Sequence, residues 1–262
     1  MKHTDTKKRT HAIIPDCQVK PGVNTDYLER IGKYLAEKKP EVIVCLGDFA
    51  DMPSLSSYDK GKKSFEGRRY SQDVLIVKYA MHCLMEPIHL ERKRLRDNKK
   101  KQWNPELHML LGNHEERINR VVENTPELEG SLSVGQLAYE YHGWKVHPFL
   151  QPVFIDGVGY CHYWPSGQMG RPLATAQQAI NKLHMSTVAG HQQGKQVAYG
   201  RRADGSTITS IIAGSCYEHD EDYLTPLTNK HWRGIIMLHE VNNGTFDEMF
   251  VSLNYLKEKY NA

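Results

Sequence analysis

The sequence is poor in cysteine and has no long apolar run, and each shortage excludes a class of protein. The five cysteines are scattered, odd in number and form no Cys-x-x-Cys pair. We therefore expect reduced thiols, with neither a disulfide framework nor a zinc knuckle. No segment approaches the roughly 20 apolar residues of a membrane span, and residues 1–10 are polar and basic. These features predict a cytoplasmic protein with no signal peptide and no membrane partner.

Net charge is also small. The formal charge of the 262-residue chain is only +3, so nucleic-acid binding cannot be argued from the total. The 14 histidines, by contrast, are many for this length and favour metal chemistry. Because the chain has no repeat, low-complexity tract or linker, we expect one domain over 1–262, with 1–10 as a flexible or edge segment.

Apolar runs of strand type alternate with segments of helical periodicity, which predicts an α/β fold. A right-handed crossover in the first strand–helix–strand unit places both strand ends at one edge of a sheet. The predicted helices cover 27–35, 71–96 (kinked or split at Pro87), 116–141 (mostly helical, with interruptions near 125–126 and 130–131) and 172–185. The predicted strands cover 11–15, 41–46, 107–111, 145–146, 153–155, 158–162, 188–189, 196–199, 207–213, 234–241 and 245–253.

Side chains of metal-ligand type follow five of these strands, where ligands usually bind in open α/β sheets. Any one of the turns, taken alone, is equally explained as a polar turn, but the chain has five of them. They are Asp16-x-Gln18, Gly47-Asp48-x-x-Asp51, Gly112-Asn113-His114, the lone His162 and Gly190-His191-x-Gln193.

This ordered set resembles the calcineurin-like metallophosphoesterase superfamily. The family pattern is Asp-x-His, Gly-Asp-x-x-Asp, Gly-Asn-His-Asp/Glu, a strand-end His and Gly-His-x-His. The likeness covers nearly the whole chain and is closest to bacteriophage metallophosphoesterases labelled as DNA-repair exonucleases. It implies a four-layer α/β/β/α sandwich of the metallo-dependent phosphatase type, with the active site at the carboxyl ends of the strands. For a phage-encoded chain, the compartment would be the host cytoplasm.

The resemblance also implies two divalent metal ions and a set of roles. Asp48 would bridge the ions, and His114 would be the general acid that protonates the leaving oxygen. Manganese is the expected metal, with magnesium, zinc or iron as alternatives. One complete site would be formed by Asp48, Asn113, His162 and His191, and the other by Asp48, Asp16, Gln18 and Gln193.

Two glutamines depart from the family pattern. Gln18 and Gln193 stand where the family has histidines, so an amide oxygen replaces an imidazole nitrogen. This change should weaken zinc or iron binding and favour manganese or magnesium. Asp51 is a candidate substitute ligand, and the alternative is that it orients a neighbouring side chain.

Several cations are candidates for binding substrate. Arg117 is expected either to contact a phosphate or to form a surface salt bridge, while Glu115 and Glu116 are expected to be helix-start carboxylates. The loop that carries Lys60, Lys62 and Lys63 begins on the active-site edge, so it is either a phosphate-binding or a solvated loop. The basic run over 92–101 should lie at the opposite edge, as a solvated face.

The sequence thus predicts a metal-dependent phosphoesterase, with a phosphodiesterase or nuclease acting on DNA or RNA as the leading function. The expected nucleophile is a metal-activated hydroxide. One alternative is a phosphomonoesterase or protein phosphatase of the same superfamily. Another is a non-catalytic scaffold on a partly degraded metal site, for which the two glutamines are the only support. Oligomeric state is left open.

Overall fold

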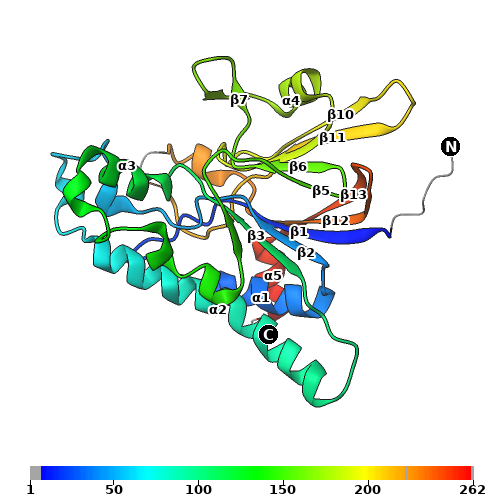
Figure 1. The fold of residues 1–262 in the computed structure, drawn as a ribbon, viewed down its shortest axis with the longest axis horizontal. Coiled ribbons are helices and arrows are strands. Elements are labelled where there is room, and N and C mark those ends of the chain that lie inside the picture. The colour runs from blue at the N-terminus through cyan, green and yellow to red at the C-terminus, as the bar shows by residue number, and fades with distance from the viewer. Residues whose placement is uncertain (1–6, 222–223, 261–262) are drawn as a thin grey trace.

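Helices flank two β-sheets in the computed structural model, which describes residues 7–221 and 224–260 (Figure 1). The helices are α1 (Asp26–Lys38), α2 (Tyr70–Asp97), α3 (Glu116–Asn124), α4 (Ala176–Leu183) and α5 (Leu253–Tyr260). The strands are β1 (Arg9–Ile14), β2 (Val42–Cys45), β3 (Glu106–Leu110), β4 (Lys145–His147), β5 (Val153–Ile155), β6 (Val158–Cys161), β7 (Pro165–Ser166), β8 (Arg171–Pro172), β9 (Ser186–Ala189), β10 (Gln196–Arg201), β11 (Thr207–Ile212), β12 (Gly234–Asn242) and β13 (Thr245–Ser252).

Both large sheets are mixed. The six-stranded sheet has the order β13-β12-β1-β2-β3-β4, in which β1 to β4 are parallel and the hairpin β12–β13 is antiparallel. The five-stranded sheet has the order β10-β11-β9-β6-β5, with β6, β9 and β11 parallel to one another. Parallel strands end on the same side, so the turns that follow them gather at one edge of each sheet.

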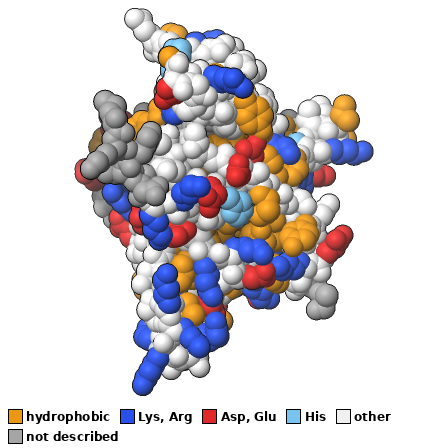
Figure 2. Space-filling view, turned by 90° about the vertical axis from the view of Figure 1, so that its right-hand side faces the viewer, with side chains coloured by type: hydrophobic (Ala, Val, Ile, Leu, Met, Phe, Trp, Pro, Cys, Tyr) orange, Lys and Arg blue, Asp and Glu red, His pale blue; other side chains and the backbone are white. Residues whose placement is uncertain are grey.

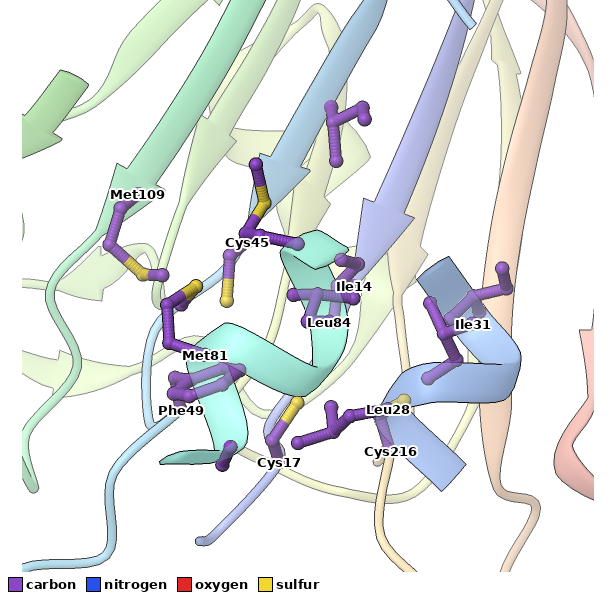
Figure 3. Close-up of a cluster of buried hydrophobic side chains, with 14 of the residues drawn as sticks. Ile14, Cys17, Leu28, Ile31, Cys45, Phe49, Met81, Leu84, Met109 and Cys216 are labelled. Carbon is purple, nitrogen blue, oxygen red and sulfur yellow. The ribbon is translucent and has the colours of Figure 1, made fainter. Parts of the chain in front are cut away.

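Alternation along the strands divides the core into layers. In β1, Ala12 and Ile14 face the helices, while Ile13 faces the second sheet. The helix-side cluster joins the six-stranded sheet to α1 and α2, where Ile14 and Cys45 meet Leu28 and Leu84 (Figure 3). A second apolar cluster lies between the two sheets, and smaller ones pack α4 against the five-stranded sheet. The fold is therefore α/β, as predicted.

Most predicted elements lie at or near the predicted positions, but two predictions are wrong in part. The helix α2 runs unbroken through Pro87 for 28 residues, so Pro87 does not split it. The segment 116–141 is α-helical only as far as Asn124; the predicted interruptions near 125–126 and 130–131 are confirmed, but only 3₁₀ turns follow them. The last predicted strand is confirmed to within one residue as β13, and α5, which was not predicted, follows it.

The N-terminal segment is only partly described. Residues 1–6 lie outside the described part, whereas Arg9 and Thr10 begin β1, which is an inner strand flanked by β12 and β2. The prediction of a flexible or edge segment is therefore wrong for these two residues.

The basic run lies at the end of the molecule away from the strand-end turns, as predicted. It covers the end of α2 and the loop before β3, so it adjoins the amino end of that strand. Figure 2 shows this face, with Lys and Arg side chains gathered at its lower end. No helix among the described residues combines the length and apolarity needed to span a membrane.

Candidate metal centre

The predicted ligand residues converge from both sheets. Asp16, Asp48 and Asn113 follow β1, β2 and β3 of the six-stranded sheet, whereas His162 and His191 follow β6 and β9 of the five-stranded sheet. Asp48, His162 and His191 each offer one ligand atom, and these atoms all lie within 4.8 Å of one another. This group could hold a metal ion.

Asn113 completes the cluster. Its Oδ1 lies 2.9 Å from Nε2 of His162 and 2.8 Å from Nδ1 of His191. Nε2 of His162 also lies 3.4 Å from Oδ2 of Asp48. A neutral amide oxygen, a carboxylate and two imidazoles therefore point at one small volume, and together they form a mixed nitrogen and oxygen donor set for a divalent ion.

Two glycines allow the turns to approach one another closely. A Cβ atom on Gly112 would stand 2.1 Å from Oδ1 of Asp48, and one on Gly190 would stand 2.5 Å from Oδ1 of Asp16. No side chain fits at either position, so the packing of the turns requires glycine. Asp48 and His191 also have left-handed φ angles of 49° and 68°. Such uncommon backbone conformations cluster at functional sites.

Hydrogen bonds fix the orientation of His162. Its Nδ1 lies 2.8 Å from the carbonyl oxygen of Leu46, which leaves Nε2 facing the cluster. Burial disfavours its imidazolium, but Asp48 and then Asp16 outweigh this effect and raise the pKa of His162 to about 9. Burial and the neighbouring His162 lower the pKa of His191 to about 4. A cation is therefore favoured among these ligands, whether it is a proton or a metal ion.

On the other side of Asp48, buried acceptor atoms lack partners. Oδ1 of Asp16 accepts from the backbone N–H of His191, but Oδ2 of Asp16 and Oε1 of Gln18 have no hydrogen-bond partner. Both residues are fully buried. Burial and the charge of Asp48 raise the pKa of Asp16 to about 7. Buried oxygens normally have partners, and a second cation here would satisfy these two.

Gln193, the other predicted ligand of this second site, is engaged elsewhere. Its Oε1 accepts a hydrogen bond of 2.8 Å from the hydroxyl of Tyr217. The amide oxygen has a second lone pair, but the Tyr217 contact sets its direction. The structure thus brings Asp16 and Gln18 to Asp48 and ties Gln193 to Tyr217.

His114 lies beside the cluster and is held by Asp51. Its Nδ1 lies 2.7 Å from Oδ1 of Asp51, and its Nε2 lies 3.8 Å from Oδ2 of Asp48. Burial opposes the charge on His114, but Asp48 and Asp51 raise its pKa overall. Of the two roles considered for Asp51, its contacts favour orienting His114.

Arg117 forms a salt bridge, as one of the two expectations had it, but its partner is Asp51, 3.4 Å away inside the site, and not a residue at the surface. Its Nη1 donates to the carbonyl oxygen of Asp51 at 2.8 Å, and its Nη2 lies 3.3 Å from Nε2 of His114. The side chain is 16% exposed. Arg117 thus stands beside His114, with its guanidinium lining the adjoining cleft.

Glu115 and Glu116 stand at the start of α3, as predicted. Glu115 is fully buried, however, and has a second role that was not predicted. It accepts hydrogen bonds of 2.9 Å from the backbone N–H groups of Asp48, Ala50 and Gly112. The hydroxyl of Tyr139 donates to it as well. Glu115 therefore joins the turn that carries Asp48 to the turn that carries Asn113. Nothing in the local sequence could have signalled this, because the donors are up to 67 residues away.

A cleft of about 670 Å³ opens beside His114 and Arg117. Lys62 lines it, whereas Lys60 and Lys63 are exposed residues outside its lining. Its cations are matched by carboxylates: Lys62 and Arg68 bind Asp59. In all, four cations (Lys20, Lys62, Arg68 and Arg117) line the cleft with five carboxylates (Asp51, Asp59, Glu66, Asp73 and Glu221). The cleft is therefore not a basic track for a polyanion.

Comparisons of the chain with models of protein families and with curated proteins found no match. Function is therefore inferred from the geometry of the site and from the residue pattern.

Proposed function

We propose that the protein is a metal-dependent phosphoesterase with a two-ion centre at the carboxyl ends of its strands. The observation that carries the proposal is the convergence of Asp48, Asn113, His162 and His191 beside the Asp51–His114 pair. A decayed scaffold has no need of an oriented proton donor next to its ligands. We also propose that the α/β fold is the four-layer sandwich of the metallo-dependent phosphatases.

The donor set fits divalent ions on both sides of Asp48. One ion would be held by Asp48, Asn113, His162 and His191, and a second by Asp48 with the unpartnered oxygens of Asp16 and Gln18. When bound, such ions neutralise charge on phosphoryl oxygens and make hydroxide available at neutral pH. The oxygen-rich second site favours manganese or magnesium.

The chain's own residues supply the remaining steps. As an imidazolium, His114 would carry the transferable proton at Nε2, because Asp51 binds Nδ1 and the nearby carboxylates raise the pKa of the imidazole. Arg117, a donor 3.3 Å from Nε2, opposes that charge until its guanidinium turns to the phosphate. His114 gives that proton to the leaving oxygen as the phosphorus–oxygen bond breaks. Arg117, packed against His114, binds a non-bridging oxygen of the same phosphate.

We propose a phosphodiester as the substrate, on the strength of the resemblance. The balanced charge of the cleft favours a small diester or a chain end over a long internal stretch of DNA or RNA. A monoester remains the alternative within the same chemistry.

The test is hydrolysis of bis-p-nitrophenyl phosphate, p-nitrophenyl phosphate, and single- and double-stranded oligonucleotides, with manganese, magnesium and zinc in turn. We expect manganese-dependent hydrolysis of the small diester, with the monoester slower. If protein shown to bind metal hydrolyses none of these substrates with any of the metals, the proposal is wrong and the non-catalytic scaffold is the remaining alternative.

A further inference from the structure

Three histidines gather far from the strand-end centre, on the exposed side of α2. His82 and His89 are seven residues apart on this helix, so they stand two turns apart on the same face. His142 reaches them from the 3₁₀ turn Glu140–His142. Its ring lies 5.8 Å from that of His89 and 6.5 Å from that of His82, measured between centroids.

The distance between His89 and His142 suits a shared ion. Nε2 of His89 and Nδ1 of His142 are 3.5 Å apart. A good N–H···N or N–H···O hydrogen bond is shorter, at about 2.9–3.0 Å. Two imidazole nitrogens bound to one tetrahedral zinc ion at about 2.0–2.1 Å stand about 3.3–3.4 Å apart. The spacing of these two nitrogens therefore matches that of two zinc ligands. The rings face each other end to end, so both must turn to direct their lone pairs at one ion.

We propose that His82, His89 and His142 bind a zinc ion, or a similar imidazole-preferring divalent ion, at a site separate from the strand-end centre. His82 is exposed and completes the set by rotation of its side chain. Glu86, one turn from each helical histidine, is available as a fourth ligand. Bound zinc ties the middle of α2 to the segment after α3.

The charge state of the cluster supports this site. Burial lowers the pKa of His142, and the neighbouring His89 and His82 lower it further. The pKa of His89 is lowered by burial, then by Arg92, with Glu86 opposing. Imidazole must be neutral to bind a metal, so little proton release is needed at neutral pH. Imidazole ligands favour zinc over manganese, which separates this site from the oxygen-rich one.

The test measures zinc content and affinity by equilibrium dialysis of the full chain. The background for these measurements, called the parent, is a variant with Asp48→Asn and His191→Ala, which remove ligands of the strand-end centre. We expect one zinc ion per chain in this parent. Adding His89→Gln and His142→Asn should weaken zinc binding about tenfold or more, since even residues behind a ligand change affinity by that factor.

The matched control is His184→Asn, which removes an exposed histidine outside the cluster at a left-handed backbone position that asparagine tolerates. It should leave zinc affinity unchanged. In the unsubstituted protein, zinc should also shift the imidazole NMR signals of His89 and His142, which covers the case of a parent that folds poorly. Equal zinc affinity in the parent and the His89/His142 variant, or unshifted signals, would overturn the site. Neither readout uses catalytic activity, so the result is independent of the proposed function.

Discussion

At the scale of single residues, His114 allows the most direct test of the proposed chemistry. Replacing it by alanine removes the proton donor but none of the proposed ligands. The rate should fall roughly 10²–10⁴-fold while metal content stays unchanged. The loss should be smaller for leaving groups such as p-nitrophenolate, which need no proton. Rates measured across a series of leaving groups check this, with His184→Ala as the control. An equal loss for all leaving groups would contradict a general acid.

Glu115 is the residue whose substitution should most disturb the turns. Glutamine at this position keeps the size but presents an NH₂ group to backbone N–H donors. At least one charge-assisted hydrogen bond is lost, and the new NH₂ group faces a backbone N–H that no longer has an acceptor. Together these changes should destabilise the fold by about 2–3 kcal/mol. Denaturant unfolding measures the change. Glu116→Gln is the matched control and should stay within about 0.5 kcal/mol of the unsubstituted chain. If the two variants are equally stable, Glu115 does not stabilise the fold by joining the two turns.

We expect the two glutamines to influence the metal preference of the second site. We expect one ion, on Asn113, His162 and His191, to remain through purification and the second to require added manganese. Activity should then rise with manganese after the first site is full. Gln18→His combined with Gln193→His should tighten the second ion and extend the choice of metal towards zinc. Because Gln193 is bound by Tyr217, Gln18→His alone should account for most of the gain. Metal analysis and titration test this, and two tightly held ions in the untreated protein would refute it.

Residue types at strand ends were predictable, but contacts between distant turns were not. Asp16, Asp48, Asn113, His162 and His191 could be picked from the sequence because each follows an apolar run. Glu115 could not, since an acid after Gly-Asn-His looks the same locally whether it faces solvent or three buried N–H groups. For the same reason, the sequence could not show that the salt bridge of Arg117 lies inside the site and not at the surface.

At the scale of elements, the predictions succeeded where periodicity was strong and failed where packing overrides local signals. Pro87 lacks only one helical hydrogen bond, and α2 is held on both sides of it by buried Leu84 and Ile88. Between Asn124 and Tyr141, the helical pattern is broken by proline and glycine often enough that only 3₁₀ turns form. The short α5 was not predicted, since its buried face consists of only two residues, Leu253 and Leu256.

The β3–β4 pair carries a buried histidine contact that should make the fold sensitive to acid. His108 and His147 stack, and their facing nitrogens are 3.0 Å apart. Burial, and then the charge of His108, lower the pKa of His147 to about 4. An unfolded histidine has a pKa near 6.5, so below that pH the unfolded chain binds more protons than the folded one. The stability that neutral His147 contributes is therefore present above about pH 6.5 and is lost as the pH falls towards 4.

The measurable quantity is the slope of unfolding free energy against pH between 4.5 and 6.5. His147→Gln should reduce that slope by up to about 1.4 kcal/mol per pH unit, the value for one proton. His184→Gln, at an exposed position, should leave the slope unchanged. A slope unaltered by His147→Gln would mean that other groups cause the acid sensitivity.

At the scale of the whole molecule, the centre stands where the two sheets meet. Asp48 and Asn113 come from the six-stranded sheet, whereas His162 and His191 come from the five-stranded sheet. The apolar layer between the sheets holds them together along their length. At the strand ends, polar turns replace that layer, so a metal ion there would join the two sheets.

Metal binding should therefore stabilise the whole fold. Manganese at 100 times its dissociation constant should add about 2.7 kcal/mol, which for a chain of this size raises the melting temperature by about 5–10 °C. Calorimetry with manganese and after chelation measures the shift. We choose manganese for this experiment because the histidine cluster on α2 is expected to bind zinc but not manganese. Asp48→Asn removes a ligand from one sheet and His191→Ala removes a ligand from the other, so either change alone should abolish most of the shift. His184→Ala should keep it. A full shift in His191→Ala would mean that the ion is bound by the six-stranded sheet alone, and the centre would not link the sheets.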